Sequence, residues 1–232
     1  MFTRQAKMKK SRVIYDDAQA VNFREIRMGN IAPGTLFRSS HPIKDNKQET
    51  AISMMAGRAR IAAVLNLCDT NSALSSKAFF APWYNALFTN GRIIGLGMDY
   101  SVTSDRFKNK FKDALRFILK TDGPYLIHCH AGVDRTGFIC MVLEAFMGAK
   151  LDDVIDDYLL SFNSIFESSI YESQKADSQV AIKILSVMSD SIAITDKNLQ
   201  QVAEIYLQKK IGLSAVEIEL LKNKLSGNME KI

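Results

Sequence analysis

The stretch from Pro124 to Phe146 constrains the fold of this 232-residue chain more than any other. Residues 124–127, Pro-Tyr-Leu-Ile, form a short apolar run typical of a buried strand, and from Phe138 onward apolar residues recur at helical spacing. Between the two patterns lies the polar segment 128–137, which reads His-Cys-His-Ala-Gly-Val-Asp-Arg-Thr-Gly. The sequence therefore predicts a buried strand, a tight loop and a helix in direct succession.

A loop in this position is suited to hold an anion. Backbone N–H groups in the first turn of a helix lack intrahelical partners and carry the positive end of the helix dipole. Gly132 and Gly137 let the backbone curl, and Arg135 offers a planar fork of donors to two phosphate oxygens. The same surroundings favour the thiolate of Cys129, which is the reactive form of the side chain. The hydroxyl of Thr136 is placed to assist departure of the thiolate from a covalent intermediate.

The segment 128–137 resembles the protein tyrosine phosphatase superfamily, whose Cys-x5-Arg loop forms a phosphocysteine intermediate. Other segments resemble a bacterial and fungal branch of it, tyrosine phosphatase family 3. These are residues 22–24, 34–40 and 157–161, and the C-terminal residues Tyr206, Leu207, Gly212, Leu213, Ser214, Glu217, Leu220 and Leu221. The similarity extends from about residue 20 to residue 226.

Two departures from the branch concern the substrate. Members commonly have lysine where this chain has Val133, so one cation that could favour inositol headgroups is absent. Many members read Asp-Leu-Arg after an early strand, whereas this chain has Asn66-Leu67-Cys68-Asp69. Both differences weaken any transfer of substrate contacts from relatives.

The resemblance implies a role for each residue of the loop. Cys129 is the expected nucleophile, Arg135 is expected to hold the phosphoryl group, and Thr136 is expected to support the thiolate. For His128, either a hydrogen bond that orients the loop or a purely structural place in the core is consistent with the sequence. The expected substrate-binding residues are His130, Ala131, Gly132, Val133, Asp134 and Arg135.

Two aspartates compete for the general acid that protonates the leaving group. Asp99 follows a predicted strand directly, and its spacing to Cys129 leaves room for one helix and one strand, as in dual-specificity phosphatases. Asp134 is the alternative, since that loop position carries the acid role in the bacterial branch. Asp105 lies in a first helical turn, where it complements the dipole. We expect Asp99 to be the acid and retain Asp134 as the competitor.

The three cysteines do not form a disulfide framework and fit a reducing compartment. Cys140 lies inside the helix after the loop and is expected in the core. Cys68 is expected to end a strand near the loop, as does the cysteine that forms a protective disulfide with the nucleophile in phosphatase-and-tensin lipid phosphatases. Two interpretations of Cys68 stand, a redox partner of Cys129 and a small buried hydrophobic residue.

The sequence predicts neither a metal site nor a cofactor. The three histidines look scattered and without partners at ligand spacing, and His41 before Pro42 is interpreted as a loop residue. The acidic cluster Asp152, Asp153, Asp156 and Asp157 is interpreted as the solvated face of a helix.

Composition favours one domain over residues 21–232, which the resemblance makes a phosphatase domain, preceded by a basic, flexible tail over residues 1–20. A hydrophobic content of 47% suffices for one substantial core. No apolar run approaches the roughly 20 residues of a membrane helix, and the N-terminus lacks a secretory signal, so we expect a cytoplasmic protein. The net charge of +5 favours anionic ligands, yet no nucleic-acid module is visible.

The expected fold is α/β, with a small central, mainly parallel sheet flanked by helices, as in cysteine phosphatases, and a helical C-terminal half. Residues 61–68 and 92–98 are predicted strands, and an amphipathic helix is predicted from Ser104. A right-handed crossover would put the strand at residue 92 parallel to the strand before Cys129, with the loop at the carboxyl end of the sheet. Helices are also predicted over 151–162, about 175–189, 196–210 and 214–225.

The expected function is hydrolysis of phosphate monoesters through a phosphocysteine intermediate, on phosphotyrosine or other phosphorylated residues of proteins. A phosphoinositide or inositol phosphate substrate is the first alternative. An inactive phosphate-binding module is the second, although the intact Cys129, Arg135 and Thr136 argue against it.

Overall fold

The computed structural model describes residues 21–44, 46–77, 81–166, 178–190 and 192–228. The tail predicted over residues 1–20 lies outside the described residues, as does the start of the helix predicted from about 175. No helix in the described ranges is long and apolar enough to cross a bilayer.

A mixed sheet of five strands forms the centre of the described chain, in the order β1-β2-β5-β3-β4. Its strands are β1 (Arg24–Ile26), β2 (Leu36–Ser39), β3 (Ala63–Asn66), β4 (Ile93–Gly95) and β5 (Tyr125–His128). Strand β1 pairs antiparallel with β2, and the other neighbours pair parallel. The predicted mainly parallel sheet is therefore confirmed, and β5 lies at its middle.

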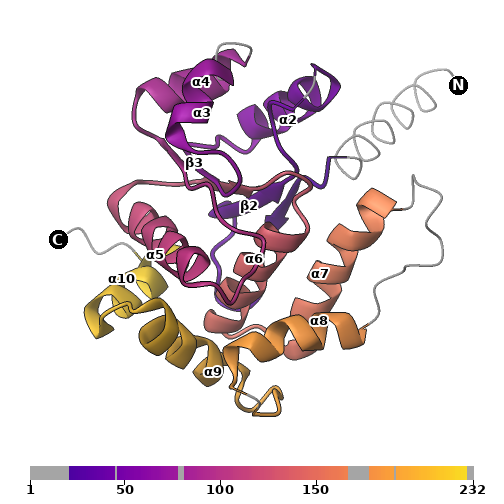
Figure 1. The fold of residues 1–232 in the computed structure, drawn as a ribbon, viewed down its shortest axis with the longest axis vertical. Helices are drawn as coiled ribbons and strands as arrows, with labels where there is room; N and C mark the ends of the chain where they lie inside the picture. Colours follow the sequence, from indigo (N-terminus) through magenta and orange to yellow (C-terminus); the bar gives the residue numbers. More distant parts are fainter. Residues whose placement is uncertain (1–20, 45, 78–80, 167–177, 191, 229–232) are drawn as a thin grey trace, which may run out of the picture.

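Helices cover both faces of this sheet (Figure 1). On one side lie α2 (Asn46–Arg58), α3 (Asn71–Lys77) and α4 (Pro82–Thr89). The other side carries α5 (Asp105–Lys120), α6 (Asp134–Phe146), α7 (Leu151–Phe166), α8 (Ser178–Leu185), η3 (Ser186–Met188), α9 (Leu199–Tyr206), the π-helical segment η4 (Leu207–Ile211) and α10 (Ala215–Leu225). The predicted helical C-terminal half is thus confirmed.

Two hydrophobic cores result, one on each face of the sheet. Along β5, Tyr125 and Ile127 pack into the larger core with α5 and α6, while Leu126 between them packs into the smaller core on the opposite face. Successive side chains of a strand point to opposite faces, so a central strand buried on both sides reads as a continuous apolar run. This explains why residues 124–127 are apolar without alternation.

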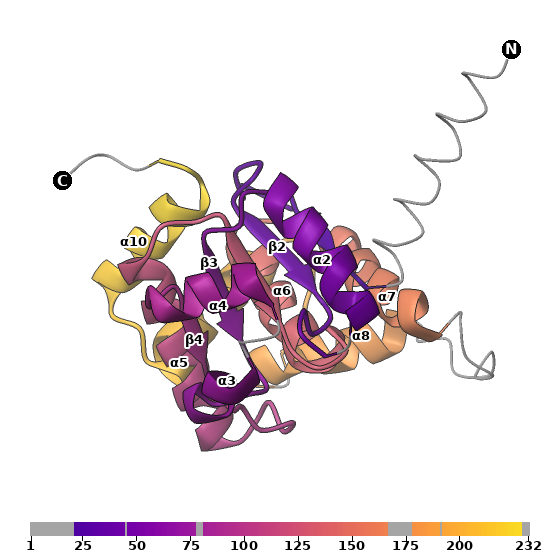
Figure 2. The same ribbon diagram turned by 90° about the horizontal axis from the view of Figure 1, so that it is seen from above.

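The amphipathic helix predicted from Ser104 is α5. The Ser104 side chain accepts a hydrogen bond from the N–H of Phe107 and caps the helix, and Phe107, Phe111, Leu115 and Ile118 form its buried face. The capping box predicted from Ser214 and Glu217 is present at the start of α10. Figure 2 shows the same arrangement from above, with α2 and α4 in front of β2 and β3.

Candidate active site

The loop between β5 and α6, residues 129–135, will be called the cysteine loop. It leaves the central strand of the sheet at its carboxyl end, and α6 begins within it at Asp134. Gly132 adopts a left-handed conformation with φ of 76°, and a Cβ atom there would lie 2.4 Å from the backbone oxygen of Ser39. Glycine is therefore required at this position, because the loop turns tightly against the end of β2.

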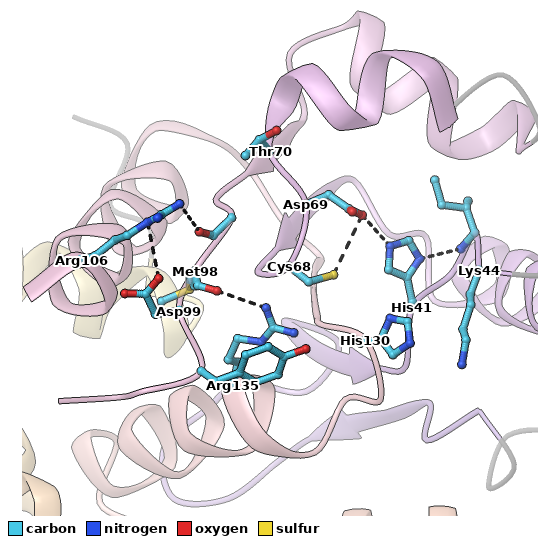
Figure 3. Close-up of a pocket in the computed structure, with 13 residues that line it drawn as sticks. His41, Lys44, Cys68, Asp69, Thr70, Met98, Asp99, Arg106, His130 and Arg135 are labelled. Atoms are coloured by element: carbon cyan, nitrogen blue, oxygen red, sulfur yellow. Dashed lines mark hydrogen bonds and ion pairs between the residues drawn. The ribbon is translucent and has the colours of Figure 1, made fainter. Parts of the chain in front are cut away.

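A pocket of about 780 Å³ opens beside the cysteine loop. Its walls come from the segments that follow β2, β3, β4 and β5, which all end at the same edge of the sheet. Ligand sites of open α/β sheets lie at this edge. Figure 3 shows the side chains of the pocket, which are His41, Ile43, Lys44, Cys68, Asp69, Thr70, Gly97, Met98, Asp99, Tyr100, Arg106, His130 and Arg135.

Arg135 extends from α6 into this pocket (Figure 3). Its Nη1 donates to the backbone oxygen of Met98 at 3.2 Å, and its guanidinium carbon lies 4.2 Å from the ring centroid of Tyr100. Its Nε is buried without a hydrogen-bond partner among the described residues. This donor is thus available to an anion in the pocket.

Cys129 is 2% exposed and is not one of the residues that line the pocket. It follows His128, the last residue of β5, and lies in the loop that leads to Arg135. The hydroxyl oxygen of Thr136 is buried and has no hydrogen-bond partner in the described part of the chain. A cysteine sulfur, a guanidinium and a hydroxyl group without a partner in the described part of the chain therefore lie within residues 129–136.

The two candidate acids occupy different environments. Asp99 lines the pocket, where its Oδ2 accepts from the Ser104 hydroxyl at 2.9 Å and its Oδ1 lies 3.5 Å from Arg106 Nε. Asp134 is exposed at the start of α6 and does not line the pocket. Its charge acts on Tyr158, whose pKa rises to about 12 mainly through burial and then through Asp134. The pocket thus brings Asp99, and not Asp134, together with Arg135.

His128 is fully buried and lies within a chain of hydrogen bonds. Its Nδ1 is 3.3 Å from the backbone oxygen of Cys129, and its Nε2 is 3.0 Å from the hydroxyl of Tyr84. Asn66 donates through Nδ2 both to that hydroxyl and to Asp69 Oδ2. The Tyr84 proton is therefore directed to Nε2, which leaves the ring proton on Nδ1, facing the backbone oxygen of Cys129. Burial lowers the pKa of His128 well below its usual range, consistent with a neutral ring.

His41 corrects the interpretation of the histidines as scattered and unpartnered. It is buried, lines the pocket, and places Nε2 2.6 Å from Asp69 Oδ2. Its Nδ1 accepts from the N–H of Ile43, so the ring proton is on Nε2 and donates to Asp69. Ligand atoms of His41, Cys68 and His128 lie within 4.8 Å of one another. A metal ion bound there would have to replace hydrogen bonds that both imidazoles already make.

The cysteines lie where the sequence predicts. Cys140 is fully buried, and burial raises the pKa of its thiol to about 12. Cys68 follows β3, lines the pocket, and is 3.3 Å from Asn66 Oδ1 through its sulfur. In Figure 3 its sulfur points toward the centre of the pocket. Cys68 is therefore accessible from the pocket rather than enclosed in a core.

Asp157 corrects the interpretation of the acidic cluster as a solvated helix face. Asp152, Asp153 and Asp156 are exposed, but Asp157 is 4% exposed and pairs with Arg24 and Arg38. Asp157 comes four positions after Asp153, so helical spacing alone puts both on one face. The apolar positions around Val154 and Tyr158 are the signal that could have indicated a buried Asp157.

Sequence reasoning missed His41, Asp69 and Tyr84 as residues of the site. They follow or precede different strands and meet only because β2, β3 and β5 are neighbours in the sheet. The position of Asp69 three residues after Asn66, at the end of a predicted strand, was the available signal.

The model of the tyrosine phosphatase family matches residues 17–227. Comparison with curated proteins finds no match. Among solved structures, the chain is similar to the core catalytic domain of the PP-IP phosphatase SIW14 from S. cerevisiae in complex with citrate, with 21% identity over 86% of this chain and 94% of that chain and a TM-score of 0.46. A second structure of the Siw14 catalytic core has 18% identity over 85% of this chain and 96% of that chain, with a TM-score of 0.44.

Proposed function

This chain belongs to the tyrosine phosphatase family and is a cysteine-dependent phosphatase, and we propose that it dephosphorylates phosphotyrosine and other phosphorylated residues of proteins. The observation that carries this proposal is the meeting of Arg135, Tyr100 and Asp99 in one pocket beside the cysteine loop. Arg135 supplies the anion site, and Asp99 supplies a carboxyl group. Tyr100 presents an aromatic ring that is 70% exposed and able to pack against a phosphorylated aromatic side chain.

In the proposed first step, the Cys129 thiolate attacks phosphorus in line with the leaving oxygen. The sulfur–phosphorus bond forms as the phosphorus–oxygen bond breaks, and Asp99 gives its proton to the departing oxygen. Arg135 and the N–H groups of the cysteine loop hold the other phosphoryl oxygens, and these fixed donors supply most of the acceleration.

In the proposed second step, water attacks the phosphocysteine and releases inorganic phosphate. Asp99, now a carboxylate, accepts the proton of the attacking water, which restores the acid for the next turnover. Thr136 donates its free hydroxyl to the sulfur and stabilises the departing thiolate. No cofactor is required by either step.

A second candidate substrate class, phosphoinositides or inositol phosphates, is favoured by the other basic side chains of the pocket. Lys44, Arg106 and His130 line it together with Arg135. Burial, followed by the charge of Lys44, lowers the pKa of His130 and favours its neutral form, so Lys44 and Arg106 supply the additional positive charge. A substrate with several phosphates would be able to use these groups, whereas a phosphopeptide needs only one anion site.

The test is phosphate release by the full chain from a phosphotyrosine peptide, a phosphoserine peptide and a panel of soluble phosphoinositides and inositol phosphates. We expect the highest kcat/KM on the phosphotyrosine peptide. Lys44→Ala separates the two classes, because it should weaken activity on polyphosphates and leave the peptide unaffected. Lys150→Ala, an exposed lysine beyond the opposite end of α6, is the matched control. A higher kcat/KM on a phosphoinositide or inositol phosphate than on the peptides, lost in Lys44→Ala, would contradict a protein substrate and support the second substrate class.

Cys129→Ser serves as the blank in these assays, and we predict that it is inactive. A serine hydroxyl is not ionised by its surroundings, so turnover should fall to the background on every substrate. A substantial rate in this variant would contradict the cysteine mechanism. A wild-type protein that releases no phosphate from any substrate, yet binds inorganic phosphate, would instead support an inactive binding module.

We also propose that Cys68 is the redox partner of Cys129. Strands β3 and β5 are neighbours, with Asn66 paired to His128, so the two cysteines follow adjacent strand ends. With hydrogen peroxide, two thiols give one disulfide and two molecules of water. After treatment with peroxide and then dithiothreitol, we expect the wild type to recover its activity. Cys68→Ser should recover less, because the sulfenic acid of Cys129 has no partner thiol there and can oxidise further. Equal recovery would contradict the pairing.

We propose a single phosphatase domain over residues 21–232 with a basic tail before it, and residence in the cytoplasm. The family match over residues 17–227 supports one domain, and the number of cysteines, three, suits a reducing compartment better than a disulfide framework.

A further inference from the structure

A cluster of charged side chains is buried behind the cysteine loop. Arg24 Nε lies 2.7 Å from Asp157 Oδ1, and Arg38 Nη1 lies 2.5 Å from Asp157 Oδ2. Arg38 and the neighbouring Glu144 are fully buried, and Asp157 is 4% exposed. The four residues come from β1, β2, α6 and α7, so the cluster joins the sheet to two helices.

Arg38 connects this cluster to the cysteine loop. While Nη1 pairs with Asp157, its Nη2 donates to the backbone oxygen of Gly132 at 2.8 Å. Asn22 donates to the same oxygen at 3.1 Å. The planar fork of one guanidinium thus bridges a carboxylate on α7 and a carbonyl in the loop, and it fixes the two acceptors more rigidly than an ammonium group on a flexible stem does.

The direction of that carbonyl sets the direction of a donor. A trans peptide is planar, and its C=O and N–H point in opposite directions. The peptide between Gly132 and Val133 has its oxygen held by Arg38 and Asn22, so the N–H of Val133 points away from them. The N–H of His41 holds the oxygen of His130 at 3.1 Å in the same manner, which orients the N–H of Ala131.

The cluster is an unusual element for stability alone. Burying charges costs free energy that pairing only partly returns, so a buried pair is weak evidence of a stabilising role. Burial and Asp157 raise the pKa of Glu144 well above its usual range, whereas Arg38 and Arg24, against the effect of burial, lower the pKa of Asp157. Two cations then face one anion, which leaves a net positive charge behind a loop that binds phosphate.

We propose that Arg38 and Asp157 are positioning residues for phosphate binding. Asp157 holds the Arg38 guanidinium, and Arg38 turns the peptide between Gly132 and Val133 so that its N–H faces the phosphoryl group. The inference rests on the proposed function of the cysteine loop. Three of the segments that carry the family resemblance supply this network: Asn22 and Arg38 donate to the Gly132 oxygen, and Asp157 holds Arg38.

The test compares Asp157→Asn with Asp156→Asn, its exposed neighbour on the same helix. Three quantities are measured on the full chain: affinity for inorganic phosphate by calorimetry, kcat/KM, and thermal unfolding. We expect Asp157→Asn to lose roughly 10- to 100-fold in phosphate affinity and in kcat/KM, the effect of displacing a group that orients a binding residue. Asp156→Asn should stay within about twofold of the wild type.

Arg38→Lys is the second variant. It keeps the positive charge but replaces the two-nitrogen fork that joins Asp157 to the Gly132 oxygen. It should lower phosphate affinity in the same direction while remaining folded. Either folded variant with phosphate affinity within about twofold of the wild type would overturn the proposal, since a purely structural role lowers only the unfolding temperature. If neither variant folds, Asn22→Gly decides in the same way, because it removes one donor to the Gly132 oxygen and no buried charge.

Failure of the proposed function is distinguishable from failure of this inference. A wild type that hydrolyses no substrate but binds phosphate more tightly than Asp157→Asn would contradict the function and support the positioning role. An active wild type with an equally active Asp157→Asn would support the function and contradict the positioning role.

Discussion

Tyr100 holds the guanidinium of Arg135 in place at the mouth of the pocket. The ring is exposed, yet it lies against a cation at 4.2 Å, and such a contact at an exposed site contributes about 0.5–1 kcal/mol. Tyr100→Ala should therefore lower kcat/KM about two- to fivefold on any phosphate ester. Tyr100→Phe keeps the ring and should retain the rate. Equal losses in both variants would assign the effect to the hydroxyl instead of the ring.

Asp99 and Asp134 can be separated by the leaving group of the substrate. Loss of a general acid typically costs about 100- to 10,000-fold, and costs less when the leaving oxygen is itself a weak base. Asp99→Asn should thus lose far more activity on a phosphotyrosine peptide than on p-nitrophenyl phosphate, while Asp134→Asn loses little on either. The opposite pattern would make Asp134 the acid and Asp99 a residue of the pocket wall.

At this scale the sequence predicts the residues that are close together in the chain. Cys129, Arg135 and Thr136 lie within eight consecutive residues, so their spacing alone indicates the proposed chemistry. His41, Asp69 and Tyr84 reach His128 through tertiary contacts between separate strands and a helix. A short-range pattern does not contain such contacts, and these residues were consequently missed.

Helix α5 links the stability of an element to the candidate acid. The Ser104 hydroxyl accepts from the N–H of Phe107 and donates to Asp99 Oδ2, so one side chain caps the helix and orients the carboxylate. Ser104→Ala should lower the free energy of unfolding by about 0.5–2 kcal/mol, the usual cost of a lost cap, and should also lower kcat.

Ser214→Ala is the matched control for this prediction. It removes a cap of the same kind from α10, which does not contribute to the pocket. Urea denaturation should show a similar loss of stability in both variants, whereas only Ser104→Ala should have a lower kcat. Equal kcat in the two variants would mean that Asp99 does not depend on Ser104.

The elements with strong periodicity were predicted well. Residues 61–68 and 92–98 contain β3 and β4, residues 151–162 lie in α7, and residues 196–210 contain α9 and most of η4. Strands β1 and β2 and helices α2 to α4 were not predicted. Those strands have three and four residues, too few to show an alternation, and α2 begins with five polar residues, so apolar residues occur only in its later part.

On the scale of the whole molecule, the parallel strands bring the ends of four segments to one edge and thereby create the pocket. The parallel orientation predicted for the strands before residues 98 and 129 is confirmed, since β4 and β5 both run parallel to β3, which lies between them. The order of the strands could not be read from the sequence, because the apolar runs of β3 and β5 are equally suited to the centre. Because β2 and β3 lie on either side of β5, the residues that follow them, His41 and Asp69, come into contact.

The same arrangement buries two titratable groups with opposite effects on stability. Burial lowers the pKa of His128 well below 6.5, with His41 adding to the effect, and burial beside Asp157 raises the pKa of Glu144 well above 4.5. Above pH 4.5 the unfolded chain loses a proton that folded Glu144 keeps, so stability falls as the pH rises. Below pH 6.5 the unfolded chain gains a proton that folded His128 refuses, so stability falls as the pH falls.

Above pH 6.5 the contribution of Glu144 is therefore no longer opposed by His128. One proton gives a slope of up to about 1.4 kcal/mol per pH unit, until the folded carboxyl itself ionises beside Asp157, Arg38 and Arg24. Glu144→Gln keeps the shape of the side chain but removes the group that titrates. It should therefore flatten the fall in unfolding free energy between pH 6.5 and about pH 8. Urea denaturation at several pH values measures the slope, and the exposed Glu219→Gln should retain that of the wild type. A slope unchanged in Glu144→Gln would mean that the folded protein holds this carboxyl ionised.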